Sequence, residues 1–216
     1  MDMERSFSSP LLHGCVATHM LAGQSVSGDV HVVTPFPGGV LVAVIDGLGH
    51  GKEAVTAATL AVATLSAHVQ DSPLLLLQYC HEQLKGTRGV VMSLASFRAY
   101  DALMTWVGVG DVEGVLLRSD AAANPARESL PLRGGVVGYQ LPSLRATILP
   151  VRRGDLLIFA TDGVRSSFIQ EPLLRNPLIH VAQDGPQQLA DQILTRYGKT
   201  TDDALVLVAR YQGVDP

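Results

Sequence analysis

Two short stretches of continuous apolar residues, rich in β-branched and aromatic types, stand out along the chain: residues 40–45 and 156–160. A strand with one solvated face alternates apolar and polar positions, so an unbroken apolar run this short indicates a strand that is covered on both faces. Each run is followed within two residues by an aspartate and then a glycine, Asp46-Gly47 and Asp162-Gly163. The pattern therefore predicts two central strands, each with a carboxylate at its end.

The remaining elements are predicted from the same periodicities and from Gly, Pro and Asp turn signals. Strands are predicted over 14–22, 29–34, 88–98, 102–109, 112–118, 144–149 and 204–209, and helices over 52–70, 73–85 and 186–197. We expect a polar loop over 121–133 and an irregular segment over 168–185. Hairpin-like strands grouped around helix pairs predict an α+β fold in one layered domain over residues 1–216.

The composition excludes several classes of protein. Apolar residues make up 47% and charged residues 17% of the 216, a balance that a disordered chain does not have. The net charge of −4 predicts no nucleic-acid partner and no anionic-membrane partner. The first residues lack a secretory signal pattern, and no stretch is long and apolar enough to cross a membrane. Two cysteines, Cys15 and Cys80, cannot form a disulfide framework, so we expect a cytoplasmic protein.

Four aspartates share one context, a predicted strand end beside a residue that suits a tight backbone: Asp29, Asp46, Asp162 and Asp202. A carboxylate at the end of an apolar sheet is costly without a partner, and few basic residues lie beside these four. Hard cations such as Mg²⁺ and Mn²⁺ take oxygen ligands, and Gly47 could add its carbonyl. An Asp-Gly pair alone is also a common turn signal. The four positions together indicate a divalent-cation site.

The segment after residue 45, Asp-Gly-Leu-Gly-His-Gly-Lys-Glu, does not match the common phosphate-binding patterns. A phosphate loop needs Gly where Asp46 stands and Ser or Thr where Glu53 stands. A dinucleotide fingerprint needs a third Gly where Lys52 stands. The seven histidines show no metal-ligand spacing. His50 is the one that we expect to line the site, because it lies inside this segment.

Four segments together resemble the motifs of the metal-dependent serine/threonine protein phosphatases of the type 2C (PPM) family. They are Ser27-Gly28-Asp29, Val44 to Gly51, Gly154 to Val164, and Thr201 to Ala204. The form Asp-Gly-Leu-Gly-His-Gly is similar to the bacterial sporulation-stage-II and stressosome feedback phosphatase branch. The resemblance implies a four-layer αββα sandwich, in which a central antiparallel β-sandwich is flanked by helix pairs. It also implies two divalent cations, Mn²⁺ or Mg²⁺, at one end of the sandwich.

The resemblance also implies a role for each ligand. Asp46 would bridge both metals, the Gly47 carbonyl would hold one of them, Asp162 and Asp202 would bind the other, and Asp29 would act through a metal-bound water. Larger members carry a basic phosphate-binding residue near the first acidic motif, whereas this chain has no Arg or Lys between residues 5 and 52. Phosphate would then be oriented mainly by the metals and the backbone.

The activity that follows is hydrolysis of phosphoserine or phosphothreonine by a metal-bridging hydroxide. The expected partners are phosphorylated signalling proteins, of the stressosome scaffold or antagonist type. His50 is a candidate general acid for the leaving oxygen, beside Asp46 as the central catalytic carboxylate. Two alternatives are a catalytically silent binding module on the same fold and a small-molecule phosphoesterase. The choice between two neighbouring aspartates before the last predicted strand is also open: Asp203 instead of Asp202 could be the metal ligand.

Overall fold

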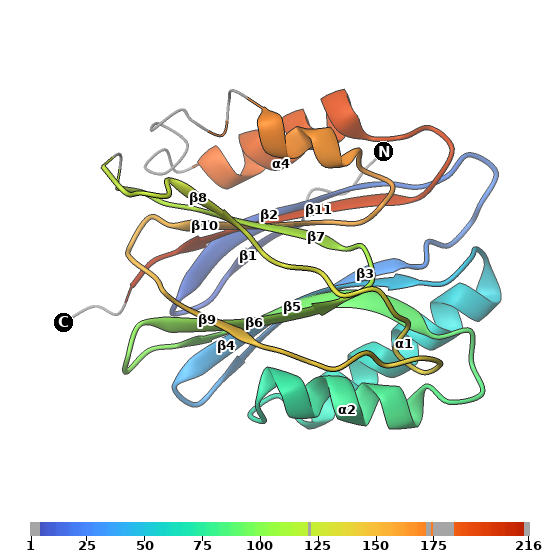
Figure 1. The fold of residues 1–216 in the computed structure, drawn as a ribbon. Helices are drawn as coiled ribbons and strands as arrows, with labels where there is room; N and C mark the ends of the chain where they lie inside the picture. The colour runs from blue at the N-terminus through green and yellow to red at the C-terminus, as the bar shows by residue number, and fades with distance from the viewer. Residues whose placement is uncertain (1–4, 121, 172–173, 175–183, 214–216) are drawn as a thin grey trace.

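The computed structural model describes residues 5–120, 122–171, 174 and 184–213. One sheet is built from β1 (Arg5–Ser8), β2 (Leu12–His19), β7 (Glu113–Leu117), β8 (Arg127–Ser129), β10 (Leu156–Ala160) and β11 (Ala204–Tyr211). The other contains β3 (Asp29–Phe36), β4 (Gly39–Gly47), β5 (Val90–Arg98), β6 (Leu103–Val109) and β9 (Thr147–Pro150). Their strand orders are β1-β2-β11-β10-β7-β8 and β3-β4-β5-β6-β9, and all pairs are antiparallel. The two sheets pack face to face (Figure 1).

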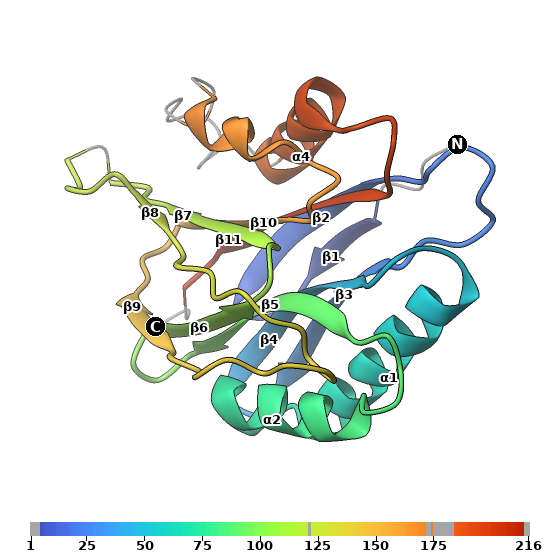
Figure 2. The same ribbon diagram turned by 45° about the vertical axis from the view of Figure 1, so that its right-hand side comes forward.

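Helices cover both outer faces of this sandwich (Figures 1 and 2). The pair α1 (Lys52–Ala67) and α2 (Pro73–Gln83) lies on the second sheet, and α4 (Gly185–Tyr197) with the short 3₁₀ helix η1 (Ser166–Gln170) lies on the first. The predicted α+β fold with an αββα order of layers is confirmed. Helix α1 packs closely through small, fully buried side chains: Ala54, Ala57, Ala58 and Ala61. Among the described residues, no helix combines the length and the apolar character needed to cross a membrane.

The two central strands are buried on both faces, as their apolar runs predict. In β4, one row of side chains lies in the core between the sheets and the other row packs toward α1 and α2. The first row is Val40, Val42 and Val44, and the second is Leu41, Ala43 and Ile45. Strand β10 alternates in the same way, with Leu157 and Phe159 between the sheets. The alternation also determines which residues at the strand ends point between the sheets.

Several predicted boundaries are wrong. The strand expected over 14–22 ends at His19, the helix over 52–70 ends at Ala67, and the strand over 144–149 starts only at Thr147. The predicted polar loop 121–133 contains β8, and β1 was not predicted at all. Both are edge strands, formed by pairing with a neighbour and carrying no apolar pattern of their own. Helix η1 overlaps the start of the expected irregular segment 168–185, most of which lies outside the described residues.

Candidate metal centre

Three of the predicted carboxylates lie at strand ends that meet at one end of the sandwich. Asp46 lies at the end of β4, Asp162 follows β10, and Asp202 precedes β11. These three side chains and Asp111 line a cavity of about 630 Å³. The other described lining residues are Leu21, Leu48, Gly49, His50, Val91, Gly110, Gly134, Gly135, Val136 and Thr201. The structure therefore brings three of the predicted ligands and His50 to one cavity.

Asp29 lies beside this group and is not among the lining residues. It stands directly opposite Asp46 in the β3–β4 hairpin. Its Oδ2 accepts a hydrogen bond from Thr161 Oγ1 at 2.7 Å, and the same hydroxyl oxygen accepts one from Leu205 N–H at 2.9 Å. Because Thr161 and Leu205 belong to the other sheet, this chain of bonds ties the two sheets together at the site. A ligand role for Asp29 through water stays a prediction.

Gly47 shapes the corner between β4 and α1. A Cβ at this position would collide with the backbone carbonyl of Ala54, so α1 can approach the strand only if residue 47 is glycine. Its N–H donates to the Gly28 carbonyl at 3.2 Å, which joins the corner to the start of β3. Gly47 is not among the cavity-lining residues. Metal ligation by its carbonyl stays a prediction.

The two neighbouring aspartates before β11 have different surroundings. Asp202 is exposed and lines the cavity. Asp203 is buried, and its carboxylate accepts hydrogen bonds from Leu21 N–H at 2.8 Å and from Gly28 N–H at 3.2 Å. Asp203 therefore stabilises the loop between β2 and β3, and both of its carboxylate oxygens already accept hydrogen bonds. This placement favours Asp202 as the ligand, which stays a prediction.

Crowding of carboxylates in a partly desolvated site changes their protonation. Burial, reinforced by repulsion from Asp29 and Asp162, raises the pKa of Asp46 to about 9. Burial also raises the pKa of Asp29 to about 7, against the opposing effect of the hydrogen bond from Thr161. The pKa of Asp162 is raised by burial and then by Asp111. Such shifts mark a site at which negative charge is undercompensated by the protein itself.

Asp111 is the site residue that the sequence did not identify. In the sequence, Gly110-Asp111 lies between the strands predicted over 102–109 and 112–118, where it is typical of a tight turn. The same signal that identified the other aspartates, an acidic residue beside glycine at a strand end, also holds for Asp111. It lines the cavity and contributes to the raised pKa of both Asp46 and Asp162.

The donor set suits hard divalent cations, because carboxylate oxygens are the ligands that Mg²⁺ and Mn²⁺ prefer. In the part of the chain that the structure describes, no group of three or more His, Cys, Asp or Glu side chains is placed so that it alone could hold a metal ion. The carboxylates surround a space instead. This arrangement fits cations that share their coordination between protein oxygens and water, as Mg²⁺ commonly does.

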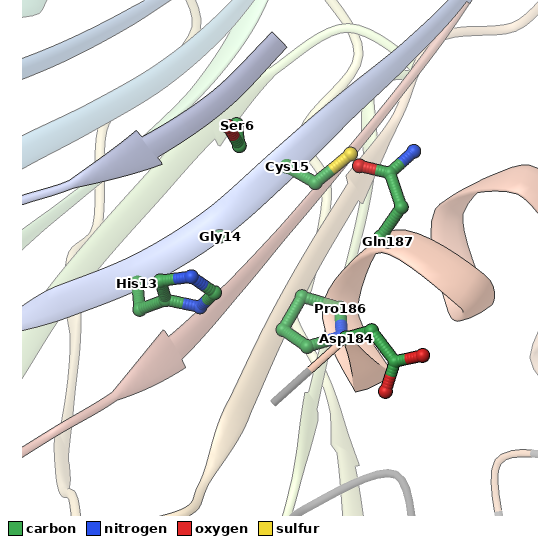
Figure 3. Close-up of a pocket in the computed structure, with 7 residues that line it drawn as sticks. All are labelled: Ser6, His13, Gly14, Cys15, Asp184, Pro186 and Gln187. Carbon is green, nitrogen blue, oxygen red and sulfur yellow. The ribbon is translucent and has the colours of Figure 1, made fainter. Parts of the chain in front are cut away.

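A second cavity, of about 500 Å³, lies between β2 and the start of α4 (Figure 3). Its lining residues are Ser6, His13, Gly14, Cys15, Asp184, Pro186 and Gln187. It has one carboxylate, and the β2 residues that line it pair with the C-terminal half of β11 and not with the end near Asp202. It lacks the carboxylate cluster that makes the first cavity a candidate metal centre.

The sandwich is shared with solved structures of known proteins. A structure of RsbX in complex with magnesium has a TM-score of 0.82 at 16% identity, over 97% of this chain and 100% of that one. The PP2C phosphatase domain of SpoIIE from Bacillus subtilis, solved with a fragment of its regulatory domain, has a TM-score of 0.77 at 18% identity, over 100% and 66%. A structure from work on the bacterial stressosome has a TM-score of 0.81 at 28% identity, over 92% and 99%.

The fold and the carboxylate cluster together define the class of protein, a metal-dependent phosphatase of the PP2C type. The family can be stated more narrowly. The model of the stage II sporulation protein E (SpoIIE) family matches residues 37–212, so the chain belongs to that family. No curated protein matches the chain.

Proposed function

We propose that the protein hydrolyses phosphoserine or phosphothreonine on phosphorylated bacterial signalling proteins of the stressosome type. The observation that carries the proposal is the meeting of Asp46, Asp162 and Asp202, from three separate strand ends, on one cavity. Burial and mutual repulsion raise the pKa of Asp46 and of Asp162. Cations are the simplest partners for such a group, and a dianionic phosphate is a natural further ligand for those cations.

In this proposal the carboxylates hold two divalent cations, Mn²⁺ or Mg²⁺. Asp46, which faces Asp29 and whose pKa is raised by Asp162, would be a ligand of both cations, while Asp162 and Asp202 would hold one of them. The Gly47 carbonyl would complete the set, and Asp29 would act through an intervening water. When bound, the cations supply an activated water for in-line attack on phosphorus and neutralise charge on the phosphate oxygens.

The chain's own residues orient the substrate and move a proton. His50 is exposed and lines the cavity, so a substrate in the cavity would lie beside its imidazole. Histidine is the side chain most often used for proton transfer in catalysis, which makes His50 the candidate general acid for the departing serine or threonine oxygen. Apolar side chains of Leu48, Val91 and Val136 form part of the wall and restrict water around the reacting group.

The substrate class follows from the resemblance of the motifs and from the similarity to a structure from stressosome work. A cytoplasmic location and a single catalytic domain are part of the same proposal. The test is Mn²⁺-dependent release of phosphate from candidate phosphoproteins of the same organism, with EDTA as the control. Turnover of an aryl phosphate without turnover of any phosphoprotein would favour a small-molecule phosphoesterase. Binding of phosphoproteins without turnover would favour a silent binding module.

A further inference from the structure

The described part of the cavity wall offers no lysine or arginine side chain to a phosphoryl group, although the substrate of the proposed function carries a phosphoryl dianion. One arginine nevertheless contacts the wall from the segment between α2 and β5. Its position is fixed by three features of the structure.

The first feature is direct packing of Arg88 against Gly49, a lining residue. A Cβ on Gly49 would lie 2.5 Å from Arg88 Nη1, so the guanidinium rests on bare backbone. The φ of Gly49 is +83°, a conformation that favours glycine. The absence of a side chain at residue 49 therefore lets the guanidinium lie against the backbone of a residue that lines the cavity.

The second feature is the anchoring of the backbone after Arg88. The Gly89 carbonyl accepts a hydrogen bond from Leu48 N–H at 3.2 Å. Val90 N–H donates to the Val137 carbonyl at 3.0 Å, on the loop whose residue Val136 lines the cavity. Arg88 is thus carried by a segment that is bonded to two different parts of the wall.

The third feature is the partner of Arg88. Its Nε forms an ion pair with Glu53 in the first turn of α1, and the two side chains are 49% and 68% exposed. An ion pair this exposed contributes little to folding stability, so stability gives a weak reason for the arrangement. Glu53 engages Nε, and Nη1 is the guanidinium nitrogen that lies beside Gly49. A guanidinium presents its N–H groups as a planar fork that matches two phosphate oxygens.

We propose that Arg88 binds the phosphoryl oxygens of the substrate, with Glu53 positioning the guanidinium. The inference rests on the proposed function, because it names a further substrate-binding residue of the same site. Lys199 is another cation in this region, but its charge acts on Asp162, where it partly offsets the raised pKa of that carboxyl. The planar fork of Arg88 is the better match for a tetrahedral anion.

The test compares Arg88→Ala and Arg88→Lys with wild type on a phosphopeptide and on an aryl phosphate, with inorganic phosphate as a competitive inhibitor. Loss of one charge-assisted contact predicts a rise of about tenfold in KM for both substrates and in the Ki of phosphate, with a smaller change in kcat. Arg88→Lys keeps the positive charge but not the planar guanidinium, so its KM and phosphate Ki should lie between those of wild type and Arg88→Ala. Glu53→Gln should raise KM less than Arg88→Ala. Arg152→Ala is the matched control, because Arg152 is 74% exposed and pairs with Asp120 away from the site.

Unchanged KM and phosphate Ki in folded Arg88→Ala, with wild-type melting, would overturn the inference. A loss confined to the phosphopeptide would also overturn it, because Arg88 would then contact residues around the phosphate and not the phosphoryl group. Absence of turnover in wild type would contradict the proposed function alone. Calorimetric binding of inorganic phosphate to the Mn²⁺-loaded protein then decides the inference, which predicts about tenfold weaker binding in Arg88→Ala.

Discussion

Replacing Asp46 by Asn tests how much the carboxylate cluster lowers the free energy of unfolding. The substitution keeps the shape of the side chain and removes its charge. Asp46 faces Asp29 across the β3–β4 hairpin, and burial with this neighbour raises its pKa from 3.8 to about 9. A carboxyl whose pKa is higher in the folded state than in the unfolded chain destabilises the fold increasingly as pH rises above the unfolded value. Metal-free wild type should therefore lose stability between pH 4 and pH 8.

The size of this loss of stability follows from the pH interval in which the Asp46 carboxyl is ionised in the unfolded chain but still protonated in the folded one. From the ordinary value of 3.8 to pH 7 this interval is about three pH units, at about 1.4 kcal/mol each. In EDTA, the free energy of unfolding of Asp46→Asn minus that of wild type should therefore be larger at pH 7 than at pH 4, by up to about 4 kcal/mol. With Mn²⁺ present, wild type should be more stable than Asp46→Asn, because bound metal stabilises only a folded state that can bind it. The same variant should lose most of its phosphatase activity.

Urea unfolding at several pH values, with and without Mn²⁺, measures both parts of this prediction. Asp120→Asn serves as the control, since its carboxylate is exposed and pairs with Arg152 far from the cluster. If wild type and Asp46→Asn show the same pH dependence in EDTA, Asp46 is not destabilised by burial and neighbours as argued. Near-normal turnover by Asp46→Asn would refute its role as the bridging ligand.

Three further predictions concern the metals, the register before β11 and the ion-pair network at the opposite end of β10. EDTA should abolish activity and added Mn²⁺ should restore it; full activity after exhaustive chelation would contradict the two-metal site. Asp162→Ala and Asp202→Ala should each lose one metal in calorimetric titration and about a hundredfold or more in rate, whereas Asp203→Ala should act mainly on stability. If Asp203→Ala loses a metal and Asp202→Ala does not, the ligand before β11 is Asp203 and not Asp202. Asp155, 1% exposed, accepts hydrogen bonds from Arg118 Nη1 at 3.0 Å and Ser119 N–H at 2.8 Å, so Asp155→Ala should cost about 3 kcal/mol of stability with KM unchanged; a large change in KM would contradict this structural role.

The sequence could predict those parts of the site that follow directly from burial. Asp46 and Asp162 each end a continuous apolar run, and such runs identify central strands without knowledge of their partners. Asp111 shares the acidic residue beside glycine at a strand end, but no continuous apolar run precedes it, so the argument from burial does not single it out. That it shares a cavity with the other aspartates depends on the pairing of β6 with β5 and of β7 with β10, which the sequence does not show directly. The edge strands β1 and β8 were missed for the same reason.

The pairing of Asp29 with Asp46 shows how a turn determines the chemistry of a site. Strands β3 and β4 are joined by the two residues Pro37 and Gly38, and Phe36 pairs with Gly39. This turn fixes every later pair of the hairpin, ending with Asp29 opposite Asp46. A slip of one residue would turn each side chain of β3 to the other face and take Asp29 away from Thr161. Like charges directly opposite each other destabilise a hairpin, so without metal the pair is relieved by protonation, and burial together with neighbouring carboxylates raises the pKa values of Asp46 and Asp29. A bound cation would relieve the same repulsion with both carboxylates ionised, so the geometry of the hairpin favours cation binding.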